Sequence, residues 1–367
     1  MRLYNVVTCT FQQFHTAIPP YIIASHRWGS EELTYQDVEG HLNTYKSGYV
    51  KLRGFLDCVR QTYPFVHWLW IDTCCIDKTN SVELSEAINS MFKWYSNATV
   101  CLAYLSDVDF STENRSAEES STRTEGSAYM SDDLKRRLQL SEWFTRGWTL
   151  QELVAPRLVV FLSRQWEVIG FKGRGFYNDT SFVAHVAALT RVPSEVLHDS
   201  RVVGRVSAEQ KIRWAIGRET TREEDSWYCL FGLLDAPIGA NYGEGSKRAR
   251  RRLLAELKEV GSISKGRVAV LAREFNERDP EFQDFPDGLE DDALTDREYQ
   301  AALFDDAQAH TEEEPPEDRP RPSPETVRRL YALIIAQGYS RSDAVEMLRE
   351  YVATGRIARL RQLQVAA

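Results

Sequence analysis

The sequence lacks several features that would place it in a familiar class at once. It has no apolar run close to the roughly 20 residues that cross a bilayer. Its first residues, Met1-Arg2-Leu3-Tyr4-Asn5, lack the apolar core of a signal peptide. An excess of basic residues is also missing, because the formal net charge is −9, and this disfavours binding to a nucleic-acid backbone. We therefore expect a cytoplasmic protein with neither nucleic-acid nor membrane partners.

Cysteines in a metal-binding spacing are absent as well. The six cysteines stand at positions 9, 58, 74, 75, 101 and 229, and no two of them form a CxxC motif. This spacing indicates neither a disulfide framework nor a structural zinc site. We expect buried free thiols in a reducing compartment, with no metal and no resident cofactor.

Four short apolar segments, each bounded by polar or turn residues, are typical of buried strands. They cover residues 21–25, 67–72, 99–105 and 158–162. Helical patterns lie between them, and the clearest runs from about Ser81 to Asn97, with Asn80 and Glu83 as a predicted capping box. This alternation predicts an α/β fold with a mostly parallel sheet covered by helices on both faces.

Changes in composition divide the chain into parts. The α/β domain is predicted over residues 1–200, with an exposed loop rich in Ser, Thr and Glu at 111–133. Residues 201–262 have helical patterns and are predicted to form a helical extension. An acidic, Pro-rich linker is expected at 263–322, followed by a small helical unit at 323–367.

Three blocks of unusual composition carry a family resemblance, and a fourth fits the region that often follows the domain of that family. They are Pro19-Pro20-Tyr21-Ile22-Ile23-Ala24-Ser25-His26-Arg27-Trp28-Gly29, Trp70-Ile71-Asp72-Thr73-Cys74-Cys75-Ile76-Asp77-Lys78, Trp143-Phe144-Thr145-Arg146-Gly147-Trp148-Thr149-Leu150-Gln151-Glu152-Leu153-Val154-Ala155-Pro156, and Tyr228-Cys229-Leu230-Phe231-Gly232 with Tyr242-Gly243-Glu244-Gly245. Over roughly residues 1–260 the chain resembles the fungal heterokaryon incompatibility (HET) domain proteins. One departure is Lys78, where the family often has Gln; we expect this position at a loop edge.

The resemblance implies a fold and a role. The family triggers programmed cell death when genetically different hyphae fuse, which is a form of non-self recognition. It is thought to share its fold with Toll/interleukin-1 receptor (TIR) domains, so we expect a flavodoxin-like, TIR-like sheet. TIR-like domains pack against one another to become active. The resemblance therefore implies a homo-oligomer and a signalling partner that the sequence does not identify.

The third block suggests a chemistry. Catalytically active TIR domains carry the glutamate that cleaves NAD in a Trp-Cys-x-x-Glu-Leu element, and Trp148 and Glu152 have the same spacing. Residues four apart lie on one helical face, so an indole and a carboxylate would point together into one cleft. The indole can stack on a base, and the carboxylate can stabilise an oxocarbenium ion. The alternative is structural, with Trp148 in the core and Glu152 paired with Arg146.

Residues that follow two predicted strands complete the candidate site. Ser25, Arg27, Trp28 and Gly29 come at the end of one strand, where ligands of doubly wound sheets bind. Ser25, Arg27 and the backbone near Gly29 can hold substrate phosphates. The alternative is that Arg27 and Trp28 only brace the loop. Asp72 ends another predicted strand and is expected to line the same cleft, or else to cap the next helix.

Two further hypotheses stay open. Cys75 with His26 would make a thiol hydrolase. Glycines 243 and 245 precede a predicted helix and could present backbone amides to an anion. The main alternative to an enzyme is a self-associating interaction module without chemistry.

Overall fold

A computed structural model describes residues 1–110, 130–173, 180–236 and 238–261. All of them belong to the first of two units into which the chain divides, Met1–Ser264. The predicted loop at 111–133 falls outside the described residues except for its last four positions. The predicted linker at 263–322 and helical unit at 323–367 lie outside them entirely.

A mixed sheet of seven strands forms the centre of the first unit. Its order is β2-β1-β4-β3-β5-β6-β7. The strands are β1 (Arg2–Asn5), β2 (Phe11–Gln13), β3 (Ile22–His26), β4 (Trp68–Trp70), β5 (Val100–Tyr104), β6 (Leu158–Leu162) and β7 (Val168–Gly173). The four central strands run parallel to one another, whereas β1 is antiparallel to β4 and β7 is antiparallel to β6. The predicted, mostly parallel sheet is confirmed for these four strands.

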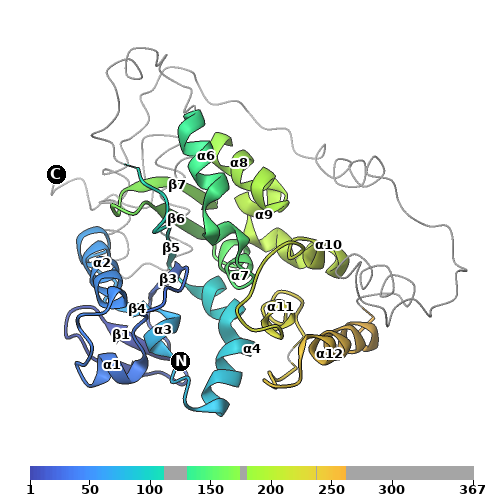
Figure 1. The fold of residues 1–367 in the computed structure, drawn as a ribbon, viewed down its shortest axis with the longest axis horizontal. Helices are drawn as coiled ribbons and strands as arrows, with labels where there is room; N and C mark the ends of the chain where they lie inside the picture. The colour runs from blue at the N-terminus through green and yellow to red at the C-terminus, as the bar shows by residue number, and fades with distance from the viewer. Residues whose placement is uncertain (111–129, 174–179, 237, 262–367) are drawn as a thin grey trace, which may run out of the picture. The chain divides into compact units, whose positions relative to one another are not determined.

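Helices flank the sheet on both sides, and Figure 1 shows α2 on one side with α4 and α7 on the other. The helices of the α/β part are α1 (Tyr35–Glu39), α2 (Ser47–Thr62), α3 (Asp72–Cys75), α4 (Ser81–Asn97), α6 (Asp132–Leu140), the 3-10 helix η2 (Glu142–Thr145), α7 (Thr149–Val154), α8 (Thr180–Thr190) and α9 (Ser194–His198). None of the helices in the described ranges is both long enough and apolar enough to cross a membrane.

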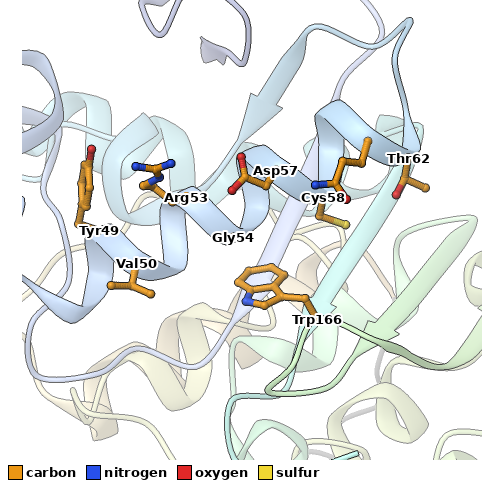
Figure 2. A pocket seen from close by; sticks show the side chains of 9 residues that line it. Tyr49, Val50, Arg53, Gly54, Asp57, Cys58, Thr62 and Trp166 are labelled. Carbon is orange, nitrogen blue, oxygen red and sulfur yellow. The ribbon is translucent and has the colours of Figure 1, made fainter. Parts of the chain in front are cut away.

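Trp166, in the turn between β6 and β7, packs against α2. Its ring stacks on Tyr104 at 4.1 Å and meets Phe55 edge-on at 4.9 Å. A Cβ atom on Gly54 would lie 2.0 Å from this indole, so the close approach requires glycine at that position. Beside the contact is a pocket that residues 49–62 of α2 line together with Trp166 (Figure 2).

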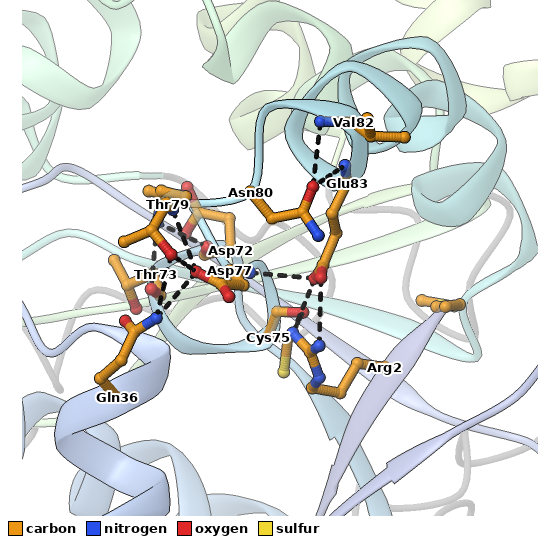
Figure 3. Close-up of polar contacts among 12 residues, drawn as sticks. Arg2, Gln36, Asp72, Thr73, Cys75, Asp77, Thr79, Asn80, Val82 and Glu83 are labelled. Atoms are coloured by element: carbon orange, nitrogen blue, oxygen red, sulfur yellow. Dashed lines mark hydrogen bonds and ion pairs between the residues drawn. The ribbon is translucent and has the colours of Figure 1, made fainter.

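The beginning of α4 was predicted correctly in part. Asn80 is the N-cap, as predicted, because its side chain accepts hydrogen bonds from backbone N–H groups of the first turn. Glu83 does not complete a capping box. Its carboxylate instead pairs with Arg2 at 2.6 Å and accepts the N–H of Asp77 at 2.9 Å (Figure 3). The terminal strand β1 is thereby tied to α4.

Residues 200–261 contain helices that are joined by turns and irregular segments in the part that the structure describes. They contain the 3-10 helix η3 (Ser200–Arg205), α10 (Ala208–Arg213), α11 (Asp225–Tyr228) and α12 (Ser246–Glu259). Ser207 caps α10 through the N–H of Gln210. One face of α12 is buried through Ala249, Leu253 and Leu257, as its periodicity predicts.

Candidate functional site

The carboxyl ends of β3 and β5 are where a ligand site is expected. From β3 the chain passes through α2 to β4, and then returns through α4 to β5 on the other side of β3. Open parallel sheets bind ligands where the connections diverge in this way. Ser25 and His26 end β3, and Arg27, Trp28 and Gly29 follow it directly. The fold therefore places these predicted residues at the expected edge.

Glu152 joins α7 to the end of β3. The hydroxyl of Ser25 donates a hydrogen bond to Glu152 Oε2, and Ser25 Oγ accepts one from Trp143 Nε1 at 2.9 Å. All three side chains are buried. An indole N–H can only donate, so Trp143 directs the hydroxyl proton of Ser25 toward the carboxyl group. Sequence analysis missed Trp143, although it lies in the same block as Glu152.

Burial raises the pKa of Glu152 to about 8, and the nearby charge of Asp72 acts in the same direction. Hydrogen bonds with Ser25 and Tyr95, together with the charge of Arg146, oppose this rise without offsetting it. At neutral pH the group is therefore mostly a carboxylic acid. A carboxyl group with so perturbed a pKa, at the ligand-binding end of a sheet, is typical of a functional site.

Asp72 holds the exposed indole of Trp28. Its Oδ2 accepts the Nε1–H of Trp28 at 2.7 Å. The ammonium of Lys78 lies 4.3 Å from the centre of the same ring and donates to the backbone carbonyls of Asp72 and Thr73 at 2.8 and 3.0 Å. Lys78 does lie in a turn, as expected for a loop edge, but its ammonium is tied to the candidate site.

Arg27 and Gly29, which were predicted to hold phosphates, have carboxylate partners. The guanidinium of Arg27 pairs with Glu142. The N–H of Gly29 donates to Glu32 Oε1 at 2.7 Å, and Glu32 also pairs with Lys51. A phosphate that binds Arg27 and Gly29 would therefore have to displace the carboxylates of Glu142 and Glu32.

Trp148 and Glu152 have different partners. The half-buried side chain of Trp148 lies near Asp225 of α11 and opposes the rise that burial causes in the pKa of that carboxyl group, whereas Glu152 faces Ser25. The backbone around Trp148 is also tied to the helical extension. Gly147 N–H donates to the carbonyl of Glu219 at 2.9 Å, and Arg218 donates to the carbonyl of Arg146 at 2.8 Å. The extension thus holds the first turn of α7, a role that the sequence did not indicate.

The thiol hypothesis gains no geometric support. Cys75 is buried, and its Sγ contacts the backbone of Leu69 and Ile71. His26 is also buried, 3.6 Å from the carboxylate of Glu32. In the part of the chain that the structure describes, no group of three His, Cys, Asp or Glu residues could hold a metal ion.

The backbone amides of Gly243 and Gly245, which were predicted to bind an external anion, instead bind a carboxylate of the protein itself. Glu224 Oε1 accepts the N–H of Gly243 at 2.9 Å and that of Gly245 at 3.2 Å. Hydrogen bonds from its own backbone N–H and from these two amides hold the pKa of Glu224 below its ordinary value, although burial opposes them. The carboxylate thereby fastens α11 to the start of α12.

Comparison with known proteins assigns a domain family to this arrangement. Residues 21–152 match the family model described as "Heterokaryon incompatibility protein (HET)". The chain therefore carries a HET domain, and the matched stretch includes Ser25, Asp72 and Glu152. No solved structure matches the chain.

A curated relative supports the same assignment. The chain is 40% identical over 255 residues to "Vegetative incompatibility protein HET-E-1" of Podospora anserina. The similarity covers 68% of this chain and 17% of the relative. The chain thus spans less than a fifth of the length of that protein.

Proposed function

We propose that this HET domain is an effector of heterokaryon incompatibility and programmed cell death that hydrolyses NAD or a related nucleotide through Glu152. The observation that carries the proposal is the buried carboxyl group of Glu152, which is bonded to Ser25 at the end of β3 and has a pKa raised to about 8. The HET family match and the similarity to HET-E-1 support the biological part. The strand order β4-β3-β5-β6 supports a flavodoxin-like, TIR-like fold.

The proposed reaction needs one carboxylate. The bond between C1′ of the ribose and the ring nitrogen of nicotinamide breaks, and its electron pair neutralises the pyridinium. A water oxygen bonds to C1′, and one proton is released. The ionised form of Glu152 stabilises the positive charge that develops on the ribose and accepts the proton from water. Because a pKa of about 8 keeps most of the group protonated at neutral pH, we expect the rate to rise between pH 6 and 8.

The alternative is a non-catalytic module that self-associates in the cytoplasm and recruits a signalling partner. The burial of Glu152, which is only 5% exposed, favours this function. On the enzyme hypothesis, association between copies has to open a path to the carboxyl group.

The test is the release of nicotinamide from NAD and from its phosphorylated form, across a wide range of concentrations of the full chain. We expect release by the wild type and a loss of about 10²- to 10⁴-fold in E152Q. That substitution keeps the shape of the side chain and removes its charge. E224Q is the matched control, because it makes the same change at another buried glutamate and should leave the rate unchanged.

The outcomes separate the two functions. Release that E152Q abolishes and E224Q preserves, with both variants folded, supports the enzyme. No turnover by wild type at any concentration, including those at which the chain self-associates, supports the interaction module.

A further inference from the structure

We infer that Trp28 is a stacking platform for the neutral purine base of a nucleotide. This inference gives the substrate class of the proposed site and so rests on the proposed function for its setting. Four observations carry it: the exposure of the indole, its anchoring at one edge, the cation on one face, and its position next to Asp72.

The indole of Trp28 is exposed and yet held in place. Its relative exposure is 41%, which is high for a tryptophan at the end of a buried strand. Its Nε1–H is fixed by Asp72 at 2.7 Å, so the ring cannot rotate without losing a charge-assisted hydrogen bond. A fixed aromatic surface binds a flat ligand with little loss of conformational entropy.

One face of the ring is occupied by a cation that is itself anchored. The ammonium of Lys78 lies 4.3 Å from the ring centre, and two of its three protons are directed to the carbonyls of Asp72 and Thr73. Lys78 therefore cannot turn away when a ligand arrives. Because the ring is 41% exposed although Lys78 contacts one of its faces, we take the opposite face as the ligand surface.

The charge of Lys78 selects the kind of base. A ring stacked on the open face, at about 3.5–4 Å, would lie roughly 8 Å from the ammonium. The positively charged nicotinamide of NAD would be repelled across this distance, and Lys78 already draws on the negative π-face that a cation would use. A neutral purine suffers no such repulsion and stacks favourably on an aromatic ring. The structure thus assigns the purine end of a dinucleotide to Trp28, which leaves the other base for a position nearer Glu152.

The position of Trp28 connects this platform to the proposed chemistry. Its anchor, Asp72, is the charge that most strongly affects Glu152. The preceding residue, Arg27, forms an ion pair with Glu142 in which both side chains are about half exposed. Exposed pairs of this kind contribute little to stability, so the guanidinium can exchange Glu142 for a nucleotide phosphate.

The experiment compares three probes by calorimetry on the full chain: adenosine monophosphate, nicotinamide mononucleotide and ribose 5-phosphate. They share a phosphorylated ribose and differ in the base. We expect the adenine nucleotide to bind most tightly. W28A should weaken its binding by about 5- to 150-fold, to the level of ribose 5-phosphate. W28F keeps an aromatic ring and should retain most of the affinity.

K78Q provides a separate measurement that does not depend on removing the indole. It deletes the charge and keeps hydrogen-bond donors. We expect it to raise the affinity for nicotinamide mononucleotide by about 2- to 30-fold while changing that for the adenine nucleotide much less. This arm decides the question even if W28A does not fold.

Two results would overturn the inference. One is unchanged binding of the adenine nucleotide to folded W28A or, should W28A not fold, no gain for nicotinamide mononucleotide in K78Q. The other is a wild type that binds the adenine nucleotide no better than ribose 5-phosphate. Binding to E152Q separates the two proposals, since E152Q should still bind the adenine nucleotide. Purine binding through Trp28 without any NAD hydrolysis would refute the enzyme and leave a purine-nucleotide site.

Discussion

Glu152 and Glu224 are two buried glutamates at short helices, and their pKa values move in opposite directions. Both side chains have little exposed surface, but burial has the largest influence on the pKa of Glu152, whereas hydrogen bonding has the largest influence on that of Glu224. Glu224 receives two backbone N–H groups of the segment before α12, and its pKa falls. Glu152 receives a hydroxyl group and has the charge of Asp72 nearby, and its pKa rises to about 8. The difference shows that the depth of burial and the fixed donors around a carboxyl group together decide whether it remains ionised.

The comparison also separates a structural carboxylate from a candidate for chemistry. Glu224 satisfies amides that would otherwise be unpaired at the start of α12. Glu152 is held in its acidic form at the end of β3, where ligands of such sheets bind. Substitutions at the two positions should therefore change the free energy of unfolding by different amounts and with opposite dependence on pH.

The largest expected effect on stability is that of E152Q at alkaline pH. The folded pKa of about 8 lies above the ordinary value of 4.5, so the folded state retains a proton that the unfolded state has lost. Stability contributed by this proton is complete below pH 4.5, falls as pH rises, and is gone above about pH 8. The pKa difference corresponds to about 4–5 kcal/mol. Gln is neutral at every pH, so E152Q should be the more stable protein at pH 9 and should match wild type near pH 4.5 in denaturant titrations. Equal stability at both pH values would contradict the raised pKa.

E224A should destabilise the protein by about 1–3 kcal/mol, because the backbone N–H groups of Gly243 and Gly245 lose their charged acceptor. E224Q keeps one acceptor oxygen and should cost less. The dependence on pH has the opposite sign to that of Glu152. With its pKa lowered, Glu224 contributes stability above pH 4.5 that is lost as pH falls through the folded value. Chemical denaturation of wild type and both variants at pH 3 and pH 7 measures this, and a larger cost at pH 3 than at pH 7 would show that another interaction dominates.

S25A should have the smallest effect, near 1 kcal/mol, because it leaves the indole N–H of Trp143 without its acceptor. It also removes a donor from Glu152, so the pKa of Glu152 should rise further. The steepest loss of stability should then move to a higher pH than in wild type. S25T restores a hydroxyl group and is the control. A midpoint that does not move in S25A would mean that Ser25 does not influence the ionisation of Glu152.

The central sheet could be predicted from the sequence because its four parallel strands are continuous apolar segments. The edge strands could not be predicted in the same way. The strand β2 consists of Phe11-Gln12-Gln13, and β7 contains Lys172 together with two glycines, Gly170 and Gly173. Lys172 is nevertheless buried, since its ammonium reaches the carbonyl of Pro156 at 2.6 Å. Only tertiary structure supplies such a partner.

The candidate site was predictable at Glu152 and less so around it. The spacing of residues along the sequence predicts on which face of α7 a side chain lies, but it does not predict which residue that side chain contacts. Trp148 lies near Asp225 of the helical extension. Ser25 accepts a hydrogen bond from Trp143, which is 118 residues away along the chain. Long-range contacts of this kind leave no periodic pattern in the sequence.

The hydrogen bonds between the start of α7 and the helical extension limit which gene segments can be exchanged between proteins without disrupting this site. The family match ends at residue 152, inside α7, yet β6 lies beyond it and pairs with β5. A gene fragment cut at that boundary would encode half a helix and a sheet with a bare edge strand. Recombination between residues 152 and 219 would also part Gly147 from its backbone partner, Glu219. The shortest segment that can move between proteins and keep this site therefore extends at least through Asp225.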